Sequence, residues 1–581
     1  MKKVTIKILC LLLTFAISLF AFTACKSLES ETHSSSELVS SDDELSSETQ
    51  DSPEVEDTAD EDFYQDEEIW EEDWSDDFEA EEGIIYEPLL VNNTKYVNEN
   101  FMGIGYIHQM FAYQKDPRGY VYTDEQKALE KEYLEKMNVK SIRAYYGADY
   151  SWDPVTQTRN FESEEMLGFY EALKQMDKLG IEVGVTAQWS LKYFLNGSSD
   201  YNKKGQFSLS GIVTDDFDQT CKNYRQFMKE TVLALKAHGI NNLKNFFVYT
   251  ECHITLRDGF DINGNPTTDY MADNEYERLF PIFHKAVTSL DQGLKDAGLR
   301  NQYKIVGPCD NWINEAKELG YSPLVKYCVE KLPDVIDIIG AHAGYAEGSN
   351  ITDDVFYDIP QELHAWAAKT ARAAGKSIWI DEFNVRASLG DSKDRYKNRD
   401  NAIKGVAAGA MVNGILNYGN ADNVFLWTLF DEQWPGNTTT GANSEFDNGI
   451  QLCGYLPCLF ESTVPYKSWY AISLMSRYIG AGKIYECEVG LGVYISAIER
   501  DDGEITLLVT NYNLEDMPCE ISFTKSLGGK NLYRYRYDIN KIVPAQGTEM
   551  IKANGVAKNI TNKLYDSIPP FSVTVYSTQK N

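Results

Sequence analysis

The sequence predicts an α/β protein: a (β/α)8 TIM barrel, with a β-sandwich after it and a disordered acidic linker before it. Three observations predict this arrangement. Short apolar strands alternate with helical segments over residues 84–480, strands with alternating side chains fill residues 481–581, and the segment before the barrel is acidic and lacks any helical or strand period. Regular alternation of strands and helices favours a parallel sheet covered by helices, and eight such units close into a barrel.

The first element, residues 1–25, is predicted to be a lipoprotein signal peptide. Lys2 and Lys3 precede an apolar run that ends in Phe22-Thr23-Ala24-Cys25, a small-residue cleavage site followed by cysteine. This ending is similar to the bacterial lipobox, in which the cysteine is lipidated. The alternative is a transmembrane anchor, but the run is shorter than the roughly 20 apolar residues of a span. We therefore expect an extracellular, cell-surface lipoprotein anchored to the bacterial membrane through Cys25.

Residues 26–83 are predicted to be the disordered linker. Between Lys26 and Glu82 there are 25 acidic residues and one lysine, which together carry −24 of the net charge of −35. Such a segment repels itself and cannot bury a core, so we expect it to hold the folded part away from the membrane or wall. The acidic balance of the chain also argues against nucleic acid as a partner, because phosphate binding needs clustered lysine and arginine.

The barrel is predicted over residues 84–480. Thr123 and Gln126 are spaced as a capping box at the start of the first barrel helix. The eight predicted strands are 101–107, 139–147, 181–189, 245–251, 303–310, 335–345, 377–384 and 423–434. The clearest predicted helices are 124–137, 163–179, 215–238, 274–297 and 466–480.

The β-sandwich is predicted over residues 481–581, where six strands show a period of two. These strands are 483–490, 493–500, 504–512, 519–525, 532–539 and 571–577. Residues 84–98 precede the first barrel strand and are a candidate extra strand of this sandwich. A packing role for the sandwich is favoured over carbohydrate binding.

Metals and cofactors are not expected. The cysteines after Cys25 form no CxxC pair and no metal-ligand spacing, and their disulfide pairing cannot be deduced from sequence. Neither a GxGxxG phrase nor a P-loop phrase is present.

Polar and aromatic residues gather where the predicted barrel strands end. In a parallel barrel those ends meet at one mouth, which is where active sites lie. Strand by strand, the candidates are Tyr106 and His108; Arg143 and Tyr145; Gln188 and Trp189; Glu251 and His253; Asp310, Asn311 and Trp312; His342 and Tyr345; Asp381, Glu382 and Asn384; Trp427 and Asp431.

Two of these residues suit a two-carboxylate reaction. Glu251 in FFVYTECHI ends strand four and Glu382 in SIWIDEFNVR ends strand seven, on opposite sides of the mouth. Retaining glycosidases place two such carboxyl groups about 5–5.5 Å apart, one as nucleophile and one as acid/base. The aromatic candidates fit this interpretation, since sugar rings pack on indole and phenol rings.

Beyond this pattern, the segment from about 95 to 480 with its flanking sandwich resembles a clan A glycoside hydrolase. It is most similar to glycoside hydrolase family 39, with the arabinofuranosidase family 51 as near neighbour. The resemblance rests on SIWIDEFNVR, IIGAHAGY, VKSIRAYYG and PYKSWYAISLMSRYIG.

The resemblance implies a role for each matching residue. Glu382 is the nucleophile and Glu251 the acid/base of a double displacement. Arg143 and Tyr345 keep Glu382 ionised and oriented, and Asp381 is a hydrogen-bonding neighbour. Together with the other candidates at the strand ends, the predicted substrate-binding residues are Tyr106, His108, Arg143, Trp189, Thr250, His253, Asp310, Trp312, His342, Tyr345, Asn384 and Trp427.

One position departs from the family pattern. Clan A enzymes have asparagine before the acid/base, where it binds the sugar 2-hydroxyl, and this chain has Thr250. A threonine hydroxyl is shorter and can both donate and accept. The substitution leaves the acid in place and puts the contact to the 2-position in doubt, with His253 as a candidate replacement.

The function predicted from these observations is a secreted, lipid-anchored retaining glycoside hydrolase that cleaves poly- or oligosaccharides. The alternative is a non-catalytic glycan-binding lipoprotein on a degenerate barrel, which Thr250 keeps open. A metal-dependent hydrolase using His108, His253 and His342 is disfavoured, because no HxH pair follows the first strand. The sequence does not specify the sugar, the linkage, endo or exo action, or the oligomeric state.

Overall fold

The protein is described by a computed structural model. It describes residues 78–108, 113, 121–188, 211–212, 214, 216–248, 273–310, 319–347, 364–386, 401–433, 446–447, 450–451, 453–488, 490, 492–541 and 548–580. The signal peptide with Cys25, and the linker up to residue 77, lie outside these ranges and stay predictions. Among the described residues, no helix combines the length and the apolar character that crossing a membrane requires.

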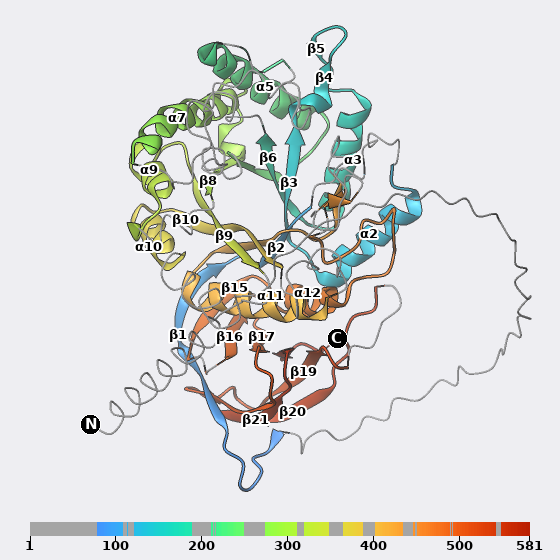
Figure 1. Ribbon diagram of the computed structural model, residues 1–581, viewed down its shortest axis with the longest axis vertical. Helices are drawn as coiled ribbons and strands as arrows, with labels where there is room; N and C mark the ends of the chain where they lie inside the picture. The colour runs from blue at the N-terminus through green and yellow to red at the C-terminus, as the bar shows by residue number, and fades with distance from the viewer. Residues whose placement is uncertain are drawn as a thin grey trace, which may run out of the picture. The chain divides into compact units, whose positions relative to one another are not determined.

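Eight parallel strands form a closed barrel, in the order β10-β11-β2-β3-β6-β7-β8-β9 (Figure 1). The predicted fold class is therefore confirmed. The barrel strands are β2 (Ile104–Ile107), β3 (Ser141–Gly147), β6 (Glu182–Gln188), β7 (Leu243–Phe247), β8 (Lys304–Asp310), β9 (Ile338–Glu347), β10 (Ser377–Arg386) and β11 (Asn423–Leu426).

Helices cover the outside of the barrel, and local capping fixes several of their ends (Figure 1). Thr123 and Gln126 form the predicted capping box at the start of α2, and Asn138 ends this helix in the left-handed conformation. The covering helices are α2 (Asp124–Met137), α3 (Glu164–Lys178), α5 (Phe217–Ala237), α7 (Asp273–Asp296), α9 (Pro323–Lys331), α10 (Ala365–Ala373), α11 (Ala402–Gly414) and α12 (Lys467–Tyr478).

Short elements decorate the connections of the barrel. The helical ones are the 3-10 turns η3 (Ala148–Ser151) and η5 (Arg300–Gln302) and the π-helix η9 (Ile415–Gly419). The strands are β4 (Trp152–Asp153), β5 (Thr158–Arg159), β12 (Glu432–Gln433), β13 (Phe446–Asp447) and β14 (Ile450–Gln451).

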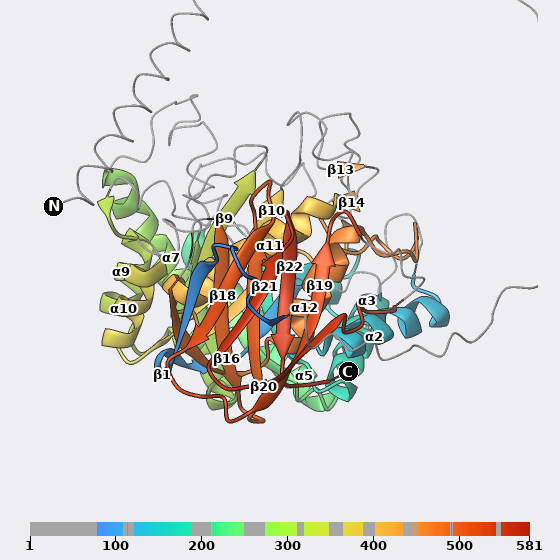
Figure 2. The ribbon, with the colours of Figure 1, turned by 90° about the horizontal axis from the view of Figure 1, so that it is seen from below.

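The second region is a nine-stranded sheet that encloses a core of its own (Figure 2). Its order is β20-β19-β22-β17-β16-β15-β1-β18-β21. The bounds are β1 (Glu87–Phe101), β15 (Gly482–Glu488), β16 (Val493–Arg500), β17 (Ile505–Asn511), β18 (Met517–Phe523), β19 (Lys530–Asp538), β20 (Gly555–Ile560), β21 (Lys563–Ile568) and β22 (Ser572–Ser577).

The N-terminal strand β1 lies inside this sheet rather than in the barrel. It pairs with β15 in antiparallel and with β18 in parallel, so strands far apart in the sequence are neighbours (Figures 1 and 2). Apolar side chains at alternate positions, such as Leu89 and Val91, are fully buried in the core of the sheet. The chain therefore enters the barrel from a strand of the sheet.

Helix α11 joins the two regions. It consists mainly of small and apolar residues, and every residue from Ile403 to Gly414 is buried. A helix that is apolar all round is expected to be covered on every side. Here the barrel strand β10 covers one side and the sheet strands β16, β17 and β22 cover the other.

Candidate active site

Strand alternation decides which side chains of β3 face the interior of the barrel. On β3, Ile142, Ala144 and Tyr146 belong to the layer between strands and helices, whereas Arg143 and Tyr145 point inward. Phe247 of β7 and Trp427, which follows β11, also lie in the interior cluster. The site is built from these inward positions.

Arg143 is the centre of the site. Its Nη1 donates to the carbonyl of Asp381 at 2.9 Å and to Oε2 of Glu382 at 3.3 Å, and its Nε donates to the Thr186 hydroxyl at 3.2 Å. The guanidinium also lies over the Phe247 ring, 4.7 Å from its centroid. Since the side chain is fully buried, these contacts fix the guanidinium in one position.

Two consecutive carboxylates of β10 face this guanidinium. Consecutive strand residues normally point to opposite faces, but the register of β10 on β9 shifts between Ile380 and Glu382. This bulge places Asp381 and Glu382 both beside Arg143, at 3.5 Å and 3.3 Å. Glu382 is 3% exposed and Asp381 is fully buried, so neither is an ordinary surface carboxylate.

His342 of β9 completes the polar cluster. Its Nε2 lies 3.6 Å from Oε2 of Glu382, 3.7 Å from Oδ1 of Asp381 and 3.5 Å from Nη1 of Arg143. The imidazole is 2% exposed. The cluster thus holds one guanidinium, one imidazole and two carboxylates in contact.

Electrostatics favour a charged Arg143 at this point. Burial by itself lowers the pKa of the guanidinium, but the charges of Tyr145, Asp381 and Glu382 outweigh that effect. The net result is a pKa above the ordinary arginine value. Arg143 therefore stays protonated and supplies a permanent positive charge next to Glu382.

Aromatic rings and one amide line the space around the cluster. Trp427 and Tyr145 meet edge to face, with centroids 5.9 Å apart. The Trp427 indole Nε1 and the Asn384 amide Nδ2 are buried and have no hydrogen-bond partner among the described residues. Two buried donors without partners are suited to bind hydroxyl groups of a ligand.

The structure does not bring Tyr106 and His108 to the cluster. The Tyr106 hydroxyl donates to the carbonyl of Ile472 on α12 at 3.3 Å, and His108 Nε2 lies 2.5 Å from Oε1 of Glu130 on α2. Both side chains therefore point to the helix layer, whereas Ile107 points into the barrel. We remove Tyr106 and His108 from the substrate-binding set.

Asp310 also lies on the helix side of its strand. The preceding residue, Cys309, belongs to the interior cluster of the barrel, so alternation puts Asp310 on the opposite face. The register of β8 on β9 shifts between Pro308 and Asp310, with Cys309 at a φ of 58° between them. This shift gives the interior position to Cys309.

Several predicted site residues lie outside what can be described. Tyr345 is placed in β9, with its backbone opposite Asn384, but its side chain is outside the described set. The remaining residues outside the described ranges are Trp189, Thr250, Glu251, His253, Asn311 and Trp312.

Sequence reasoning missed Thr186 and Phe247, which bind and stack on Arg143. Both occupy inward positions of strands that were identified correctly, but the sequence alone does not show which face of those two strands points inward. Among the described residues, no group of three or more His, Cys, Asp or Glu is arranged to hold a metal ion. The seven described cysteines after the linker are all free thiols.

No protein-family model and no curated protein matches the chain. Solved structures do. The chain is similar to the catalytic domain of GH30 xylanase C from Talaromyces cellulolyticus, with a TM-score of 0.52, 12% identity and coverage of 84% of this chain and 99% of that one. It is equally similar to an alpha-L-arabinofuranosidase from Thermotoga maritima, with a TM-score of 0.52, 15% identity and coverage of 84% and 99%.

A third similar structure is an endo-beta1,6-glucanase, with a TM-score of 0.52, 16% identity and coverage of 87% of this chain and 95% of that one. At these identities the likeness shows the fold, which is the barrel with its attached sheet. The fold is the one that the resemblance to clan A glycoside hydrolases implies. The assignment to family 39 or 51 stays a prediction.

Proposed function

We propose that the protein is a secreted, lipid-anchored retaining glycoside hydrolase that cleaves O-glycosyl bonds of poly- or oligosaccharides. The observation that carries this proposal is the buried Glu382 carboxylate, held in the barrel interior 3.3 Å from Arg143 and 3.6 Å from His342. The names of the similar structures, a xylanase, an arabinofuranosidase and a glucanase, support the reaction class.

In this mechanism Glu382 is the nucleophile. One carboxylate oxygen attacks the anomeric carbon and forms a covalent glycosyl-enzyme, while the acid/base protonates the leaving glycosidic oxygen. Arg143 and His342 are positioned to hold the carboxylate in one orientation, so that little reorganisation is needed at the moment of attack. The positive charge of Arg143 also favours the ionised form of Glu382, which is the nucleophilic form.

We assign the acid/base role to Glu251. After the first step, the Glu251 carboxylate accepts a proton from a water molecule, which attacks the anomeric carbon and releases the sugar and Glu382. Glu251 lies outside the described residues, so the expected separation of about 5–5.5 Å from Glu382 rests on the retaining mechanism itself. A separation near 9 Å would instead fit an inverting enzyme.

The sugar is proposed to pack on the aromatic side of the cluster. Trp427 offers an indole face and a buried Nε1 donor, and Asn384 offers a second buried donor. A sugar presents apolar C–H faces and hydroxyl acceptors, which match this combination. These residues are therefore proposed to bind the substrate, together with the predicted residues outside the described ranges.

The decisive experiment compares Glu382→Gln with wild type on aryl glycosides and on xylan, arabinan and β-1,6-glucan. We expect Glu382→Gln to lose at least about 1000-fold in kcat/KM, because the nucleophile is removed. The matched control is Glu182→Gln. Glu182 begins β6 at the opposite end of the barrel and accepts from Asn245, so its loss is expected to leave activity near wild type.

Product analysis tests the stereochemistry. Nuclear magnetic resonance of the first product is expected to show retention of the anomeric configuration, and inversion would contradict the proposed roles of both glutamates. If neither wild type nor control hydrolyses any substrate yet both bind a glycan, the glycan-binding alternative replaces the enzyme.

Membrane attachment is tested separately from catalysis. Cys25→Ala is expected to release the protein from the membrane fraction into the medium, because the lipid-bearing residue is absent. The activity of the released protein on a soluble aryl glycoside should equal that of the wild type. Retention of the variant in the membrane fraction would instead favour the transmembrane-anchor alternative.

A further inference from the structure

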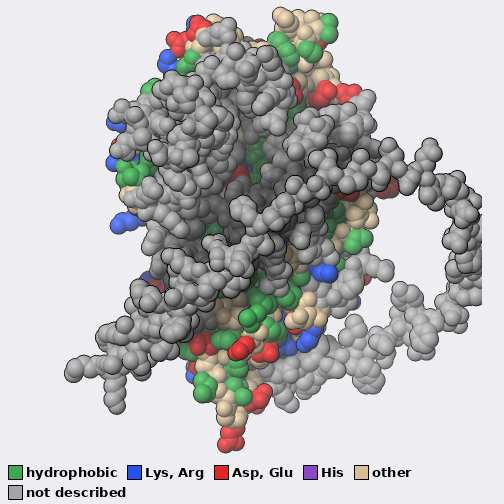
Figure 3. Space-filling view, viewed as in Figure 1, with side chains coloured by type: hydrophobic (Ala, Val, Ile, Leu, Met, Phe, Trp, Pro, Cys, Tyr) green, Lys and Arg blue, Asp and Glu red, His purple; other side chains and the backbone are tan. Residues whose placement is uncertain are grey.

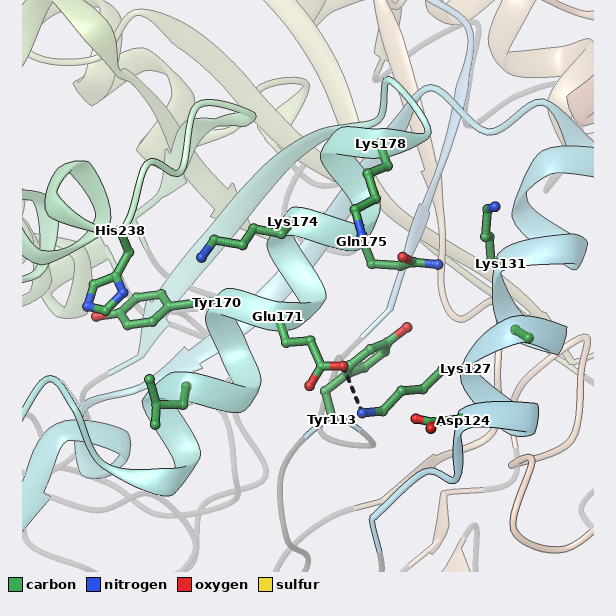
Figure 4. A pocket seen from close by; sticks show the side chains of 12 residues that line it. Tyr113, Asp124, Lys127, Lys131, Tyr170, Glu171, Lys174, Gln175, Lys178 and His238 are labelled. Atoms are coloured by element: carbon green, nitrogen blue, oxygen red, sulfur yellow. Dashed lines mark hydrogen bonds and ion pairs between the residues drawn. The ribbon is translucent and has the colours of Figure 1, made fainter.

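A groove of about 520 Å³ lies between α2 and α3 on the outside of the barrel (Figure 4). Its basic lining consists of Lys127 and Lys131 from α2 and Lys174 and Lys178 from α3. The groove is separate from the barrel interior, since none of its lining residues belongs to the Arg143 cluster. No function described above uses it.

The lysines are spaced so that they repel each other. Each helix carries its two lysines at i and i+4, which puts like charges on one face and costs about 0.2–0.5 kcal/mol per pair. The two rows line the same groove. On the face seen in Figure 3, some basic side chains of the described residues are visible around the edge of the molecule.

Acidic neighbours neutralise only one end of the groove. Lys127 binds Glu171 at 2.8 Å, and Lys131 lies 3.8 Å from Glu135. Lys174 and Lys178 are exposed and have no ion-pair partner within the described part of the chain. The C-terminal part of α3 therefore presents to the groove two lysines without ion-pair partners among the described residues, and the lining also includes the carboxylates of Asp124 and Glu171, in a chain that carries −35 as a whole.

Neutral groups of the lining suit a polar ligand with flat faces. Gln175 lies between the two unpaired lysines in sequence and adds an amide, and Leu167 is 48% exposed. Tyr170 stacks on His238 with ring centroids 4.0 Å apart, and because Tyr170 is only 2% exposed, the partly exposed His238 ring is the aromatic surface that the pair offers to the groove. Charge, amide and aromatic surface together fit an acidic sugar better than a bare anion.

We propose that this groove binds a carboxylate-bearing polysaccharide and acts as a second glycan site on the flank of the barrel. Carboxylates pair with Lys174 and Lys178, and sugar faces pack along His238 and Leu167. The acidic character of the chain does not prevent this, because charges beyond a Debye length of about 8 Å are screened at physiological salt. The choice of a glycan over another polyanion rests on the proposed function.

The test measures binding of the full chain to polygalacturonate, to its methyl-esterified form and to polyglutamate. It uses the Glu382→Gln background so that no substrate is cleaved. Lys174→Glu/Lys178→Glu is expected to weaken polygalacturonate binding by at least about tenfold, a change of about 1.4 kcal/mol. The control Lys222→Glu/Lys331→Glu makes the same charge change at exposed lysines of α5 and α9 and is expected to stay within about twofold of its parent.

Specific outcomes support or overturn the proposal. Support requires weaker binding of the methyl ester and of polyglutamate than of polygalacturonate, and weakening by salt. Equal losses in the groove variant and the control, or equal affinity for polyglutamate, would overturn it. In the active background, the groove variant should hydrolyse a small aryl glycoside like the wild type. If neither the wild type nor the groove variant hydrolyses the aryl glycoside, that result contradicts only the proposed function, because glycan binding is measured independently.

Discussion

At the scale of single residues, the site depends on one arginine that serves two carboxylates. Arg143 contacts Glu382 and the backbone and side chain of Asp381, while Thr186 and Phe247 hold the guanidinium from the other side. A planar group with several N–H donors can make these contacts at once, and a lysine ammonium cannot. The identity of residue 143 should therefore matter even when its charge is kept.

Arg143→Lys is predicted to lower kcat/KM by about 100-fold, because the Glu382 carboxylate loses a directional partner and shifts from its position of attack. The measurement is steady-state kinetics on an aryl glycoside, with circular dichroism to check folding. Arg225→Lys is the control, since Arg225 forms an exposed ion pair with Asp296 on the outside of the barrel. Wild-type kinetics in Arg143→Lys would show that charge alone is sufficient.

A second residue, His364, is predicted to make the protein sensitive to acid. It is fully buried at the start of α10, and neither ring nitrogen has a partner among the described residues. Burial lowers the pKa of His364 to about 3. Between about pH 6.5 and pH 3 the unfolded chain protonates this imidazole and the folded chain does not, so the free energy of unfolding falls as the pH falls through that window.

The expected contribution of His364 is a loss of about 2 kcal/mol on going from pH 7.5 to pH 5. His364→Leu should flatten this part of the stability curve, as measured by urea unfolding at several pH values. His284→Gln, a change at a partly exposed imidazole of α7, is expected to keep the wild-type slope. An unchanged slope in His364→Leu would show that the acid sensitivity originates elsewhere.

At the scale of elements, three neighbouring strands lose their regular register at the level of the site. Measured against β9, the irregularities lie at Cys309 in β8, at Asp381 in β10, and again between Glu382 and Asn384 in β10. Cys309 adopts a φ of 58°, which costs a non-glycine residue about 1–2 kcal/mol. Bulges of this kind redirect side chains next to active sites.

Gly340 of β9 provides the space that these bulges need. A Cβ atom there would lie 3.0 Å from Cys309 Sγ and 3.1 Å from Asp381 Oδ2. Gly340→Ala is therefore predicted to displace Asp381 and to reduce both stability, by about 1–3 kcal/mol, and kcat. Thermal unfolding and steady-state kinetics give the two values.

The control for Gly340→Ala is Gly480→Ala. The nearest atom to a Cβ at Gly480 is the flexible Arg500 side chain at 3.3 Å, which can move aside. Wild-type stability and activity in Gly340→Ala would mean that β9 does not position Asp381.

Alternation identified the barrel elements from sequence but not which face of each strand points inward. In β2, Ile104 and Tyr106 alternate with Gly105 and Ile107, so both faces are compatible with burial in a parallel sheet. Tyr106 and His108 share the face that points toward the helix layer, and for that reason the prediction that they bind substrate was wrong. Glu382 was found because SIWIDEFNVR resembles a family motif, although the bulge that turns Glu382 inward has no signal in the sequence.

The strands β20 and β21 were missed for a related reason. Their sequences, GVAKNI and KLYDSI, place charged and polar residues beside few apolar ones, so neither shows a clear period of two. They become strands because β19 and β18 offer free edges and a shared core that covers Ala557 and Leu564. Tertiary context overrides a weak local pattern here.

At the scale of the whole molecule, the barrel and the sheet share one hydrophobic core. The cluster that fills the helix layer of the barrel continues to Leu508, Tyr535 and Val573 of the sheet. Asn413 of α11 also donates to the Thr510 hydroxyl of β17 at 3.0 Å. We therefore expect the two regions to unfold as one cooperative unit.

Gly409→Val tests this cooperation at a position where α11 packs closely against the sheet. A Cβ at Gly409 would lie 2.8 Å from both Thr510 Oγ1 and Val573 Cγ2, so valine must push α11 away from the sheet. Tryptophan fluorescence reports the barrel but not the sheet, because eight of the ten tryptophans lie in residues 84–480, Trp70 and Trp74 lie in the predicted linker, and residues 481–581 contain none. Far-ultraviolet circular dichroism reports both regions. Both signals are expected to shift together to a lower midpoint, with a loss of about 2 kcal/mol or more in the free energy of unfolding.

The control is Lys369→Val, at an exposed position of α10. It introduces the same β-branched residue without the contact to the sheet and should shift the midpoint far less. Separate midpoints for the two signals would instead show that the sheet and the barrel are independent domains, and that the shared core does not couple them.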